Sequence, residues 1–150
     1  MIKAFGPAEI YKGGKWMPVT EEFQQKFDHD LEFGRLGEDF VKNFQNKNTK
    51  VEVKTERDDG NPKRWKTTGN IAIEIRCRGK KSGLSITEAQ TWIHLLSYKN
   101  KIEGGFIVNV DYLRKRVKEL IASGDARWPV MGGDDNMSQL VLVPIKKIFI

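Results

Sequence analysis

The chain has 150 residues, enough for one ordinary domain with a hydrophobic core. Its 26 Lys and Arg exceed its 20 Asp and Glu, and the formal charge of +6 favours a polyanionic partner or, equally, a solvated basic surface. The single cysteine, Cys77, excludes an intramolecular disulfide and a cysteine-rich zinc site, and two histidines alone cannot build a zinc centre. Because no apolar run approaches the roughly 18 residues of a membrane span, we expect a soluble, cytoplasmic protein.

The first third of the sequence predicts an arm followed by helix. Residues 1 to 20 mix glycine, proline and aromatics, which is typical of an irregular arm with at most one short strand. From Thr20 the pattern becomes helical, and Glu38 lies at the edge of the apolar stripe. There its carboxylate is either exposed or directed at the following strand. The stripe consists of Phe33, Leu36, Phe40, Val41 and Phe44.

Two segments show the period of a half-buried strand. Residues 51 to 56 alternate small or apolar side chains with charged ones, so the side chains of Glu52, Lys54 and Glu56 share one face. Residues 70 to 76 repeat the pattern, with isoleucines on one face and Glu74 on the other. If the two strands pair as a hairpin, their charged faces coincide. Such a face suits either a divalent cation with a phosphate or a solvated ladder of cross-strand charge pairs.

The loop between these strands, residues 57 to 66, is turn-rich, strongly charged and centred on Trp65. Its basic and aromatic side chains suit a nucleic-acid backbone, with Trp65 available for stacking, and they suit a solvated connection equally well. A second basic segment, residues 78 to 85, precedes a predicted helix that opens at Thr87 with Gln90 as a capping box. Small hydroxyls before a helix N-terminus favour a phosphate. That helix has an apolar stripe of Ala89, Trp92, Ile93 and Leu96.

The remaining sequence predicts a buried strand at 106 to 110, a helix capped by Asp111, and a strand at 140 to 143. The helix has a basic outer face that is either a DNA contact or a soluble surface. Its inward residues are Leu113, Val117, Leu120 and Ile121. The order helix, strand, strand, helix, strand, helix, strand indicates an α/β fold, with a mixed sheet flanked by helices.

The order of four motifs resembles the PD-(D/E)XK nuclease superfamily, and most closely its small phage-type nucleases related to Holliday junction resolvases. The resemblance spans about residues 33 to 110 and implies a restriction-endonuclease-like core at about 31 to 110. It implies one nuclease-like domain over 1 to 150, with an arm at 1 to 20 and a C-terminal helix and strand at 111 to 150. The motifs are Gly34-x-x-Gly37-Glu38, Val51-Glu52-Val53-Lys54, Thr68-Gly69-Asn70-x-x-Ile73-Glu74 and Lys81-Ser82-Gly83-Leu84-x-x-Thr87-Glu88-Ala89-x-x-Trp92.

In this resemblance Glu38 matches the family's helix glutamate, and Glu52 with Lys54 matches its Glu-x-Lys. The aspartate that usually precedes the Glu-x-Lys strand is missing. Either Glu74 or Asp58 supplies that carboxylate, or Glu52 takes the aspartate's part and Glu74-Ile75-Arg76 is a degenerate Glu-x-Lys. Glu52 and Glu74 belong to the site in both versions.

The resemblance implies a Mg²⁺-dependent endonuclease, with Mn²⁺ as a substitute, that cleaves branched DNA as a homodimer. Glu52 and Glu74 would ligate the metal, Glu38 would bind it directly or through water, Asp58 would complete the site, and Lys54 would orient the attacking water. The alternatives are a non-catalytic nucleic-acid-binding protein and a mismatch or restriction-type nuclease. Expected DNA contacts are Arg64, Trp65, Lys66, Arg76, Lys80, Lys81, Ser82 and Thr87.

Overall fold

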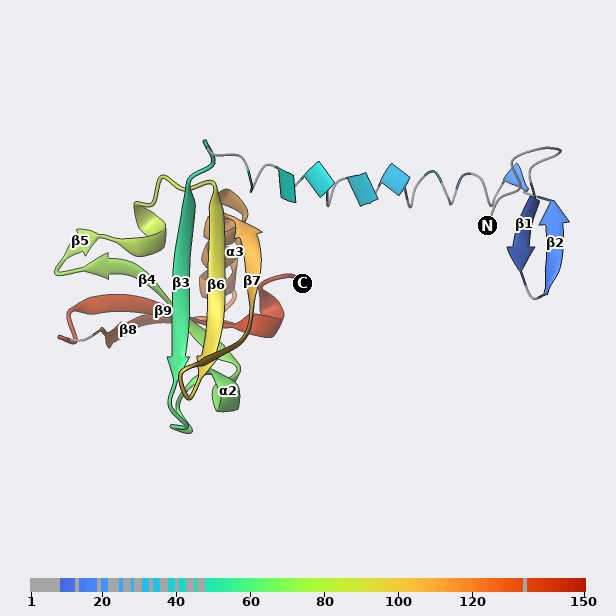
Figure 1. Ribbon diagram of the computed structural model, residues 1–150. Helices are drawn as coiled ribbons and strands as arrows, with labels where there is room; N and C mark the ends of the chain where they lie inside the picture. Colours follow the sequence, from blue (N-terminus) through green and yellow to red (C-terminus); the bar gives the residue numbers. More distant parts are fainter. Residues whose placement is uncertain are drawn as a thin grey trace. The chain divides into compact units, whose positions relative to one another are not determined.

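The chain divides into two compact units, residues 1–46 and 47–150 (Figure 1). The computed structural model describes residues 9–12, 14–18, 20–21, 25, 28, 31–32, 34–35, 38–39, 41–42, 45, 48–133 and 135–150.

In the first unit, β1 (Glu9–Lys12) and β2 (Lys15–Pro18) pair as an antiparallel hairpin, so the arm contains two strands where at most one was expected. The described positions between 21 and 45 are helical, which agrees with the predicted helix. Of its predicted apolar stripe, Val41 is described and 49% exposed. The other four stripe residues lie outside the described residues.

The second unit contains a three-stranded mixed sheet in the order β3-β6-β7. Its strands are β3 (Val51–Asp58), β6 (Thr91–Tyr98) and β7 (Lys101–Asn109). The central strand β6 runs parallel to β3 and antiparallel to β7. The register places Lys54 opposite His94, so these two side chains emerge on the same face of the sheet.

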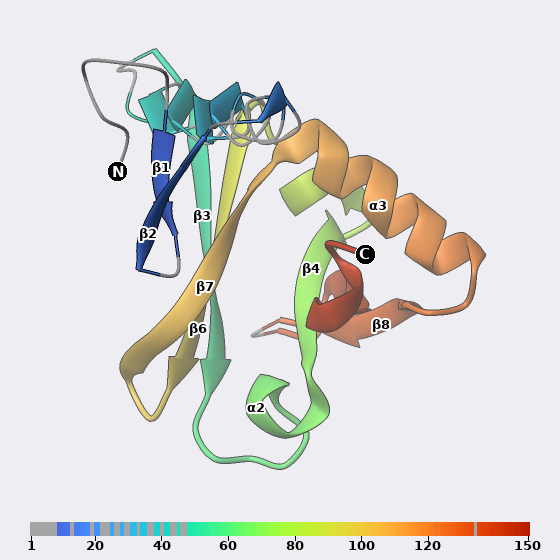
Figure 2. The same cartoon turned by 90° about the vertical axis from the view of Figure 1, so that its right-hand side faces the viewer.

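A separate antiparallel sheet has the order β5-β4-β9-β8. Its strands are β4 (Asn70–Cys77), β5 (Lys80–Lys81), β8 (Arg127–Gly132) and β9 (Ser138–Pro144). Its strands run across those of the first sheet in Figure 1, and Figure 2 shows β4 and β8 in a layer separate from β3, β6 and β7. The second unit is therefore a mixed α/β structure with two sheets.

The predicted hairpin between residues 51–56 and 70–76 is wrong, because β3 and β4 belong to different sheets. After β3 the chain makes the short helix α2 (Trp65–Thr68), which ends at Gly69 with a φ of +70°. β4 then pairs with β9, far away in the sequence. This pairing joins four fully buried side chains into one apolar layer, which a β3–β4 hairpin would not provide. They are Ile71, Ile73, Val141 and Val143.

The predicted helix from Thr87 is also wrong, because residues 91 to 98 form the strand β6. β6 is a central strand with side chains buried on both faces, and apolar residues on both faces of a strand produce spacings that also fit a helix. The capping box does not form. Thr87 Oγ1 instead accepts from the backbone N–H of Ala89 at 3.3 Å, and the Gln90 side chain accepts from Lys50 N–H at 2.9 Å.

The helix α3 (Val110–Ala122) confirms the last predicted helix, but Asn109 caps it and Asp111 does not. The Asn109 side chain accepts from the N–H groups of Asp111 and Tyr112, the arrangement of an N-cap. No helix among the described residues is long and apolar enough to cross a membrane. The fully or nearly buried core joins α3 to both sheets and to the 3₁₀ turn η1 (Gly83–Ser85). The core residues are Ile71, Ile73, Leu84, Trp92, Val108, Val110, Leu113, Val117, Leu120, Ala126, Val141, Val143 and Ile148.

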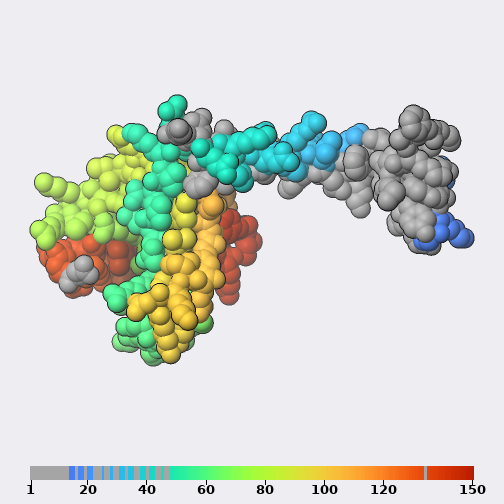
Figure 3. Space-filling view, viewed as in Figure 1, coloured from blue at the N-terminus to red at the C-terminus, as the bar shows by residue number. Residues whose placement is uncertain are grey.

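The alternation predicted for β3 is confirmed, but the charged face is the inner one. Val51 and Val53 are 36% and 51% exposed, whereas Glu52, Lys54 and Glu56 are half-buried. Figure 3 shows β3, β6 and β7 side by side on the exposed face of this unit. Valine is usually buried and charged side chains are usually exposed, so β3 reverses the common preference. Such departures are typical of functional sites, which makes the inner face of β3 the candidate site.

We expect Ile73→Ala to destabilise the protein by about 2–5 kcal/mol, because it leaves a cavity in the core. Ile73 is 0% exposed, whereas Ile107, on the outer face of β7, is 43% exposed. The matched variant Ile107→Ala should cost less than about 1 kcal/mol. Urea denaturation of both variants measures the difference. An equal loss would mean that the outer face of the first sheet is buried in solution.

Candidate functional site

The inner face of β3 begins with an ion pair between neighbours on the same strand. Lys54 Nζ lies 2.8 Å from Glu52 Oε1, and Thr87 Oγ1 donates to Glu52 Oε2 at 3.1 Å. The Lys54 hydrogen bond is the largest cause that holds the pKa of Glu52 below its usual value; desolvation opposes it, and the Lys54 charge and the Thr87 hydroxyl add to it. Glu52 is therefore ionised at neutral pH.

Glu56, two residues further along β3, joins the two sheets. Its Oε2 accepts from the backbone N–H of Ala72 on β4 at 2.9 Å and lies 3.3 Å from His94 Nε2. His94 is 1% exposed, and its Nδ1 accepts from Trp92 Nε1 at 3.3 Å. Because an indole N–H can only donate, His94 Nδ1 must be unprotonated and Nε2 carries the proton toward Glu56. Trp92, His94 and Glu56 form one continuous chain of hydrogen bonds.

Glu56 and His94 were not among the predicted site residues. Their signal in the sequence is the two-residue period: once residues 91 to 98 are known to be a strand, Trp92 and His94 share a face. The helical interpretation of this segment concealed that relationship.

Glu74 on β4 has a hydroxyl partner on each carboxylate oxygen. Ser82 Oγ donates to Oε1 at 2.5 Å, and Ser138 Oγ of β9 donates to Oε2 at 2.7 Å. Gly83 permits this close approach, since its φ is +51° and an added Cβ would lie 2.3 Å from the carbonyl oxygen of Glu74. The Ser-Gly pair thus brings η1 against β4. Ser82 and Thr87, predicted as phosphate contacts, each donate to a predicted site carboxylate instead.

Asp58 has a structural environment. It is 2% exposed, its Oδ1 accepts from Gly60 N–H at 2.8 Å, and its Oδ2 accepts from Lys66 N–H at 3.0 Å. These bonds fix the turn after β3 and the start of α2, so each oxygen of this predicted metal ligand already holds a backbone amide.

Glu38 belongs to the first unit, where its carboxylate is exposed and lies 3.9 Å from Lys42 Nζ. Across the described ranges, no three His, Cys, Asp or Glu side chains lie close enough together to hold a metal ion. Within the second unit, Glu52, Asp58 and Glu74 therefore do not form a ready metal centre.

A cleft of about 890 Å³ lies beside Glu56, between the end of β3, the α2 loop and the face of the second sheet that bears Ala72. Four cationic side chains and a single acidic one, Glu56, line it, so the cleft suits a polyanion. Trp65 also lines the cleft, and its Nε1 donates to the carbonyl of Ser97 at 2.8 Å, which fixes the indole. The cationic residues are Arg57, Lys63, Arg64 and Arg127.

Of the predicted DNA contacts, Arg64 and Trp65 line this cleft. Arg57 and Lys63 of the same predicted loop also line the cleft. Arg127, which was not among the predicted residues, belongs to β8, a strand that the sequence pattern did not reveal. Lys66 is engaged elsewhere, since its Nζ pairs with Glu103 at 2.7 Å and lies 3.9 Å from the centre of the Tyr98 ring. The remaining predicted cations, exposed on β4 and β5, are Arg76, Lys80 and Lys81.

The predicted basic face of α3 is partly occupied by intramolecular contacts. The Arg114 guanidinium donates to the carbonyls of Leu84 and Thr87, and Arg116 donates to the carbonyl of Lys147. These two arginines fasten α3 to η1 and to the C-terminal segment.

Comparison with known proteins finds no match: no family model, no curated protein and no solved structure matches the chain.

We expect Lys54→Met to raise the pKa of Glu52 toward its ordinary value, because the variant removes the main hydrogen bond to the carboxylate. A depressed carboxyl pKa stabilises the fold above the unfolded-state pKa, and that stabilisation is lost as the pH falls through the folded-state value. The stability advantage of the wild type over Lys54→Met should therefore shrink in acid. Carboxyl ¹³C shifts titrated by NMR report the pKa directly.

Lys50→Met is the matched control for this titration. Lys50 Nζ lies 2.8 Å from Glu88 Oε2, and its hydrogen bond is the main cause of the lowered pKa of Glu88. This variant should raise the pKa of Glu88 and leave that of Glu52 unchanged. A Glu52 pKa that responds equally to both variants would show that general charge, and not the Lys54 contact, lowers it.

Proposed function

We propose that this chain is a metal-dependent endonuclease that hydrolyses phosphodiester bonds of DNA, with a preference for branched substrates. The observation that best supports the proposal is the inward-facing charged row of Glu52, Lys54 and Glu56 on β3, with Glu56 at the wall of a basic cleft. The proposal also draws on the resemblance of the motifs to the PD-(D/E)XK nuclease superfamily.

The orientation of β3 is unfavourable by itself, because its half-buried charged side chains lose hydration while its valines stay exposed to water. The opposite orientation would avoid this cost. One structural reason is protection of a sheet edge: β3 is an edge strand, and inward-pointing charges discourage pairing with another chain. Edge protection alone does not require an ionised glutamate, a lysine and a buried His94–Glu56 pair on one face. We propose that the row also serves chemistry.

Hydrolysis of a phosphodiester adds negative charge to the phosphate in the transition state, and a fixed cation nearby lowers that barrier. The Lys54 side chain is 44% exposed and its ammonium is held by Glu52, so it is both accessible and positioned. In this proposal Lys54 places positive charge next to the scissile phosphate and orients the attacking water. Arg57, Arg64 and Arg127 in the cleft bind the flanking backbone.

The proposed cofactor is Mg²⁺, with Mn²⁺ as a substitute. Magnesium keeps several waters and is often bound by one or two protein carboxylates together with substrate phosphates, so a three-carboxylate cage is not required. We propose that Glu52 and Glu74 are those carboxylates. The bound metal would supply an activated water and charge neutralisation at the phosphate.

The proposal modifies the core that the family resemblance implies. A restriction-endonuclease-like core would place the Glu-x-Lys strand in a hairpin, whereas here β3 and β4 lie in separate sheets and Glu74 would approach from the second one. We further propose a homodimer, since paired cuts across a symmetric junction need two sites related by a two-fold axis.

A non-catalytic nucleic-acid-binding protein is the second candidate, and one observation favours it. Glu52 is neutralised by Lys54, and both oxygens of Glu74 are satisfied by serines, so neither carboxylate needs a further ligand for stability. This candidate keeps the basic cleft and assigns the charged row to structure. Cleavage assays separate the two.

We expect Mg²⁺-dependent cleavage of a four-way DNA junction at a higher rate than of linear duplex of equal length. Glu52→Gln and Lys54→Met should each lower the rate about 100-fold or more, because each removes a charge that acts on the reacting phosphate. The matched control is Glu88→Gln, which removes an exposed carboxylate that also pairs with a lysine, Lys50, and is not a proposed ligand. Gel analysis of a panel of linear, nicked, mismatched and four-way DNAs measures the rates. No cleavage of any member under Mg²⁺ or Mn²⁺ would favour the binding protein.

DNA affinity should depend on the cleft whether or not the protein cleaves. Arg64→Ala with Arg127→Ala should weaken binding and lower the salt dependence by about two phosphate contacts. Lys115→Ala with Lys146→Ala removes the same charge from two exposed positions that do not line the cleft. Fluorescence anisotropy at several salt concentrations measures both pairs. Equal losses in the two double variants would mean that net charge, and not the cleft, holds the DNA.

A further inference from the structure

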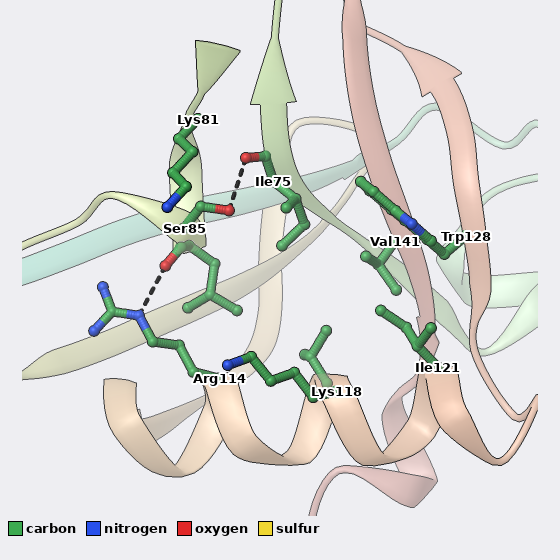
Figure 4. A pocket seen from close by; sticks show the side chains of 10 residues that line it. Ile75, Lys81, Ser85, Arg114, Lys118, Ile121, Trp128 and Val141 are labelled. Carbon is green, nitrogen blue, oxygen red and sulfur yellow. Dashed lines mark hydrogen bonds between the residues drawn. The ribbon is translucent and has the colours of Figure 1, made fainter. Parts of the chain in front are cut away.

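A second cavity, separate from the basic cleft, combines an apolar interior with a cationic rim. Its volume is about 320 Å³, and it lies between α3, η1, β4, β9 and Trp128 of β8 (Figure 4). This volume is at the lower end of the range of about 300–1,000 Å³ for small-molecule sites.

The interior of the cavity is hydrocarbon. The Trp128 indole and five aliphatic side chains line it, and the only lining hydroxyl, that of Ser85, donates to the carbonyl of Ile75 at 2.8 Å. Among its lining residues no amide or free hydroxyl remains to read the polar edge of a ligand. The aliphatic residues are Ile75, Leu84, Val117, Ile121 and Val141.

The rim of the cavity has three cations and no acidic side chain among its lining residues: Lys81, Arg114 and Lys118. Figure 4 shows these three on one side, with Trp128 and Ile121 on the other. Arg114 is held in place because its Nε donates to Leu84 O at 3.0 Å and one terminal nitrogen donates to Thr87 O at 2.5 Å. Its other terminal nitrogen lies 3.3 Å from Asp111 Oδ1, so part of its charge is already paired and the two lysines supply most of the free charge at the rim. Lys81 and Lys118 are exposed, and their long stems reach the rim from β5 and α3.

We propose that this cavity binds a small amphipathic anion, a hydrocarbon body with a carboxylate head. The body would fill the space between Trp128 and Ile121, and the head would lie among Lys81, Arg114 and Lys118. A nucleotide fits less well, since apart from the Trp128 indole the polar edges of its base would meet aliphatic side chains and lose their hydrogen bonds. A fully apolar ligand would leave the cationic rim unused.

Octanoate and its neutral counterpart 1-octanol test the assignment, with binding measured by calorimetry at neutral pH on the full chain. Octanoate should bind about fivefold more tightly than 1-octanol, because two partly solvated lysines each add a modest attraction. In Lys81→Met with Lys118→Met this preference should shrink, because only Arg114 remains at the rim, while 1-octanol binding persists. Lys115→Met with Lys146→Met, which removes equal charge elsewhere, should keep the preference.

Ile121→Phe tests the cavity itself. The phenylalanine ring would fill the space, so the variant should bind both octanoate and 1-octanol more weakly. The shift of the Trp128 indole N–H signal on titration places the ligand in this cavity. Three results would overturn the proposal: equal affinity for octanoate and 1-octanol in the wild type, a preference that is undiminished by removal of both lysines, or tighter binding of thymidine 5′-monophosphate than of octanoate.

Discussion

The carboxylate of Glu56 is the interaction that joins the two sheets of the second unit. It accepts from Ala72 N–H, at a point where β4 has a free edge, and from His94 in the centre of the first sheet. An unpaired backbone N–H at a sheet edge invites pairing with another chain, and a buried donor left without an acceptor costs about 1–3 kcal/mol. A single side chain thus satisfies one donor from each sheet. Its position also fixes which face of β3 looks inward.

Once Glu56 is turned inward, the two-residue period of a strand sends Lys54 and Glu52 inward as well and Val53 outward. The pairing of Lys54 with Glu52 then follows from geometry, since residues two apart on one face of a strand are neighbours. The basic cleft lies at the same contact, because Glu56 and Ala72 both line it. The charged row and the cleft therefore meet at Glu56.

The sequence predicted those elements whose period is set by one buried face. β3, β4 and α3 each have such a face, and their alternation or helical spacing was correct. β6 was mistaken for a helix because it is buried on both faces, and no single-face period survives in such a strand. The hairpin was wrong for a different reason: the pairing of β4 with β9 spans more than sixty residues, and local pattern contains no information about it.

In the candidate site, too, the features with a local sequence pattern could be predicted and those set by distant pairing could not. Glu52, Lys54 and Glu74 could be selected because charge at alternate strand positions is visible in the sequence. Their partners could not, since Ser138 reaches Glu74 only through the β4–β9 pairing, and Thr87 reaches Glu52 only after the predicted helix is replaced by a turn and a strand. Which carboxylates share a site depends on pairing between distant strands, which residue type alone does not specify.

The two carboxylates named as metal ligands differ in how readily they would accept a cation. Glu74 is held by two serine hydroxyls, and a hydroxyl can rotate away at the cost of one hydrogen bond, about 1 kcal/mol. Glu52 is held by an ammonium group, so a metal at its Oε1 would have to displace Lys54 against like-charge repulsion. The displaced ammonium would then be free to move to the phosphate. On these contacts Glu74 would be the easier of the two proposed ligands to load, whereas a cation at Glu52 would have to compete with Lys54.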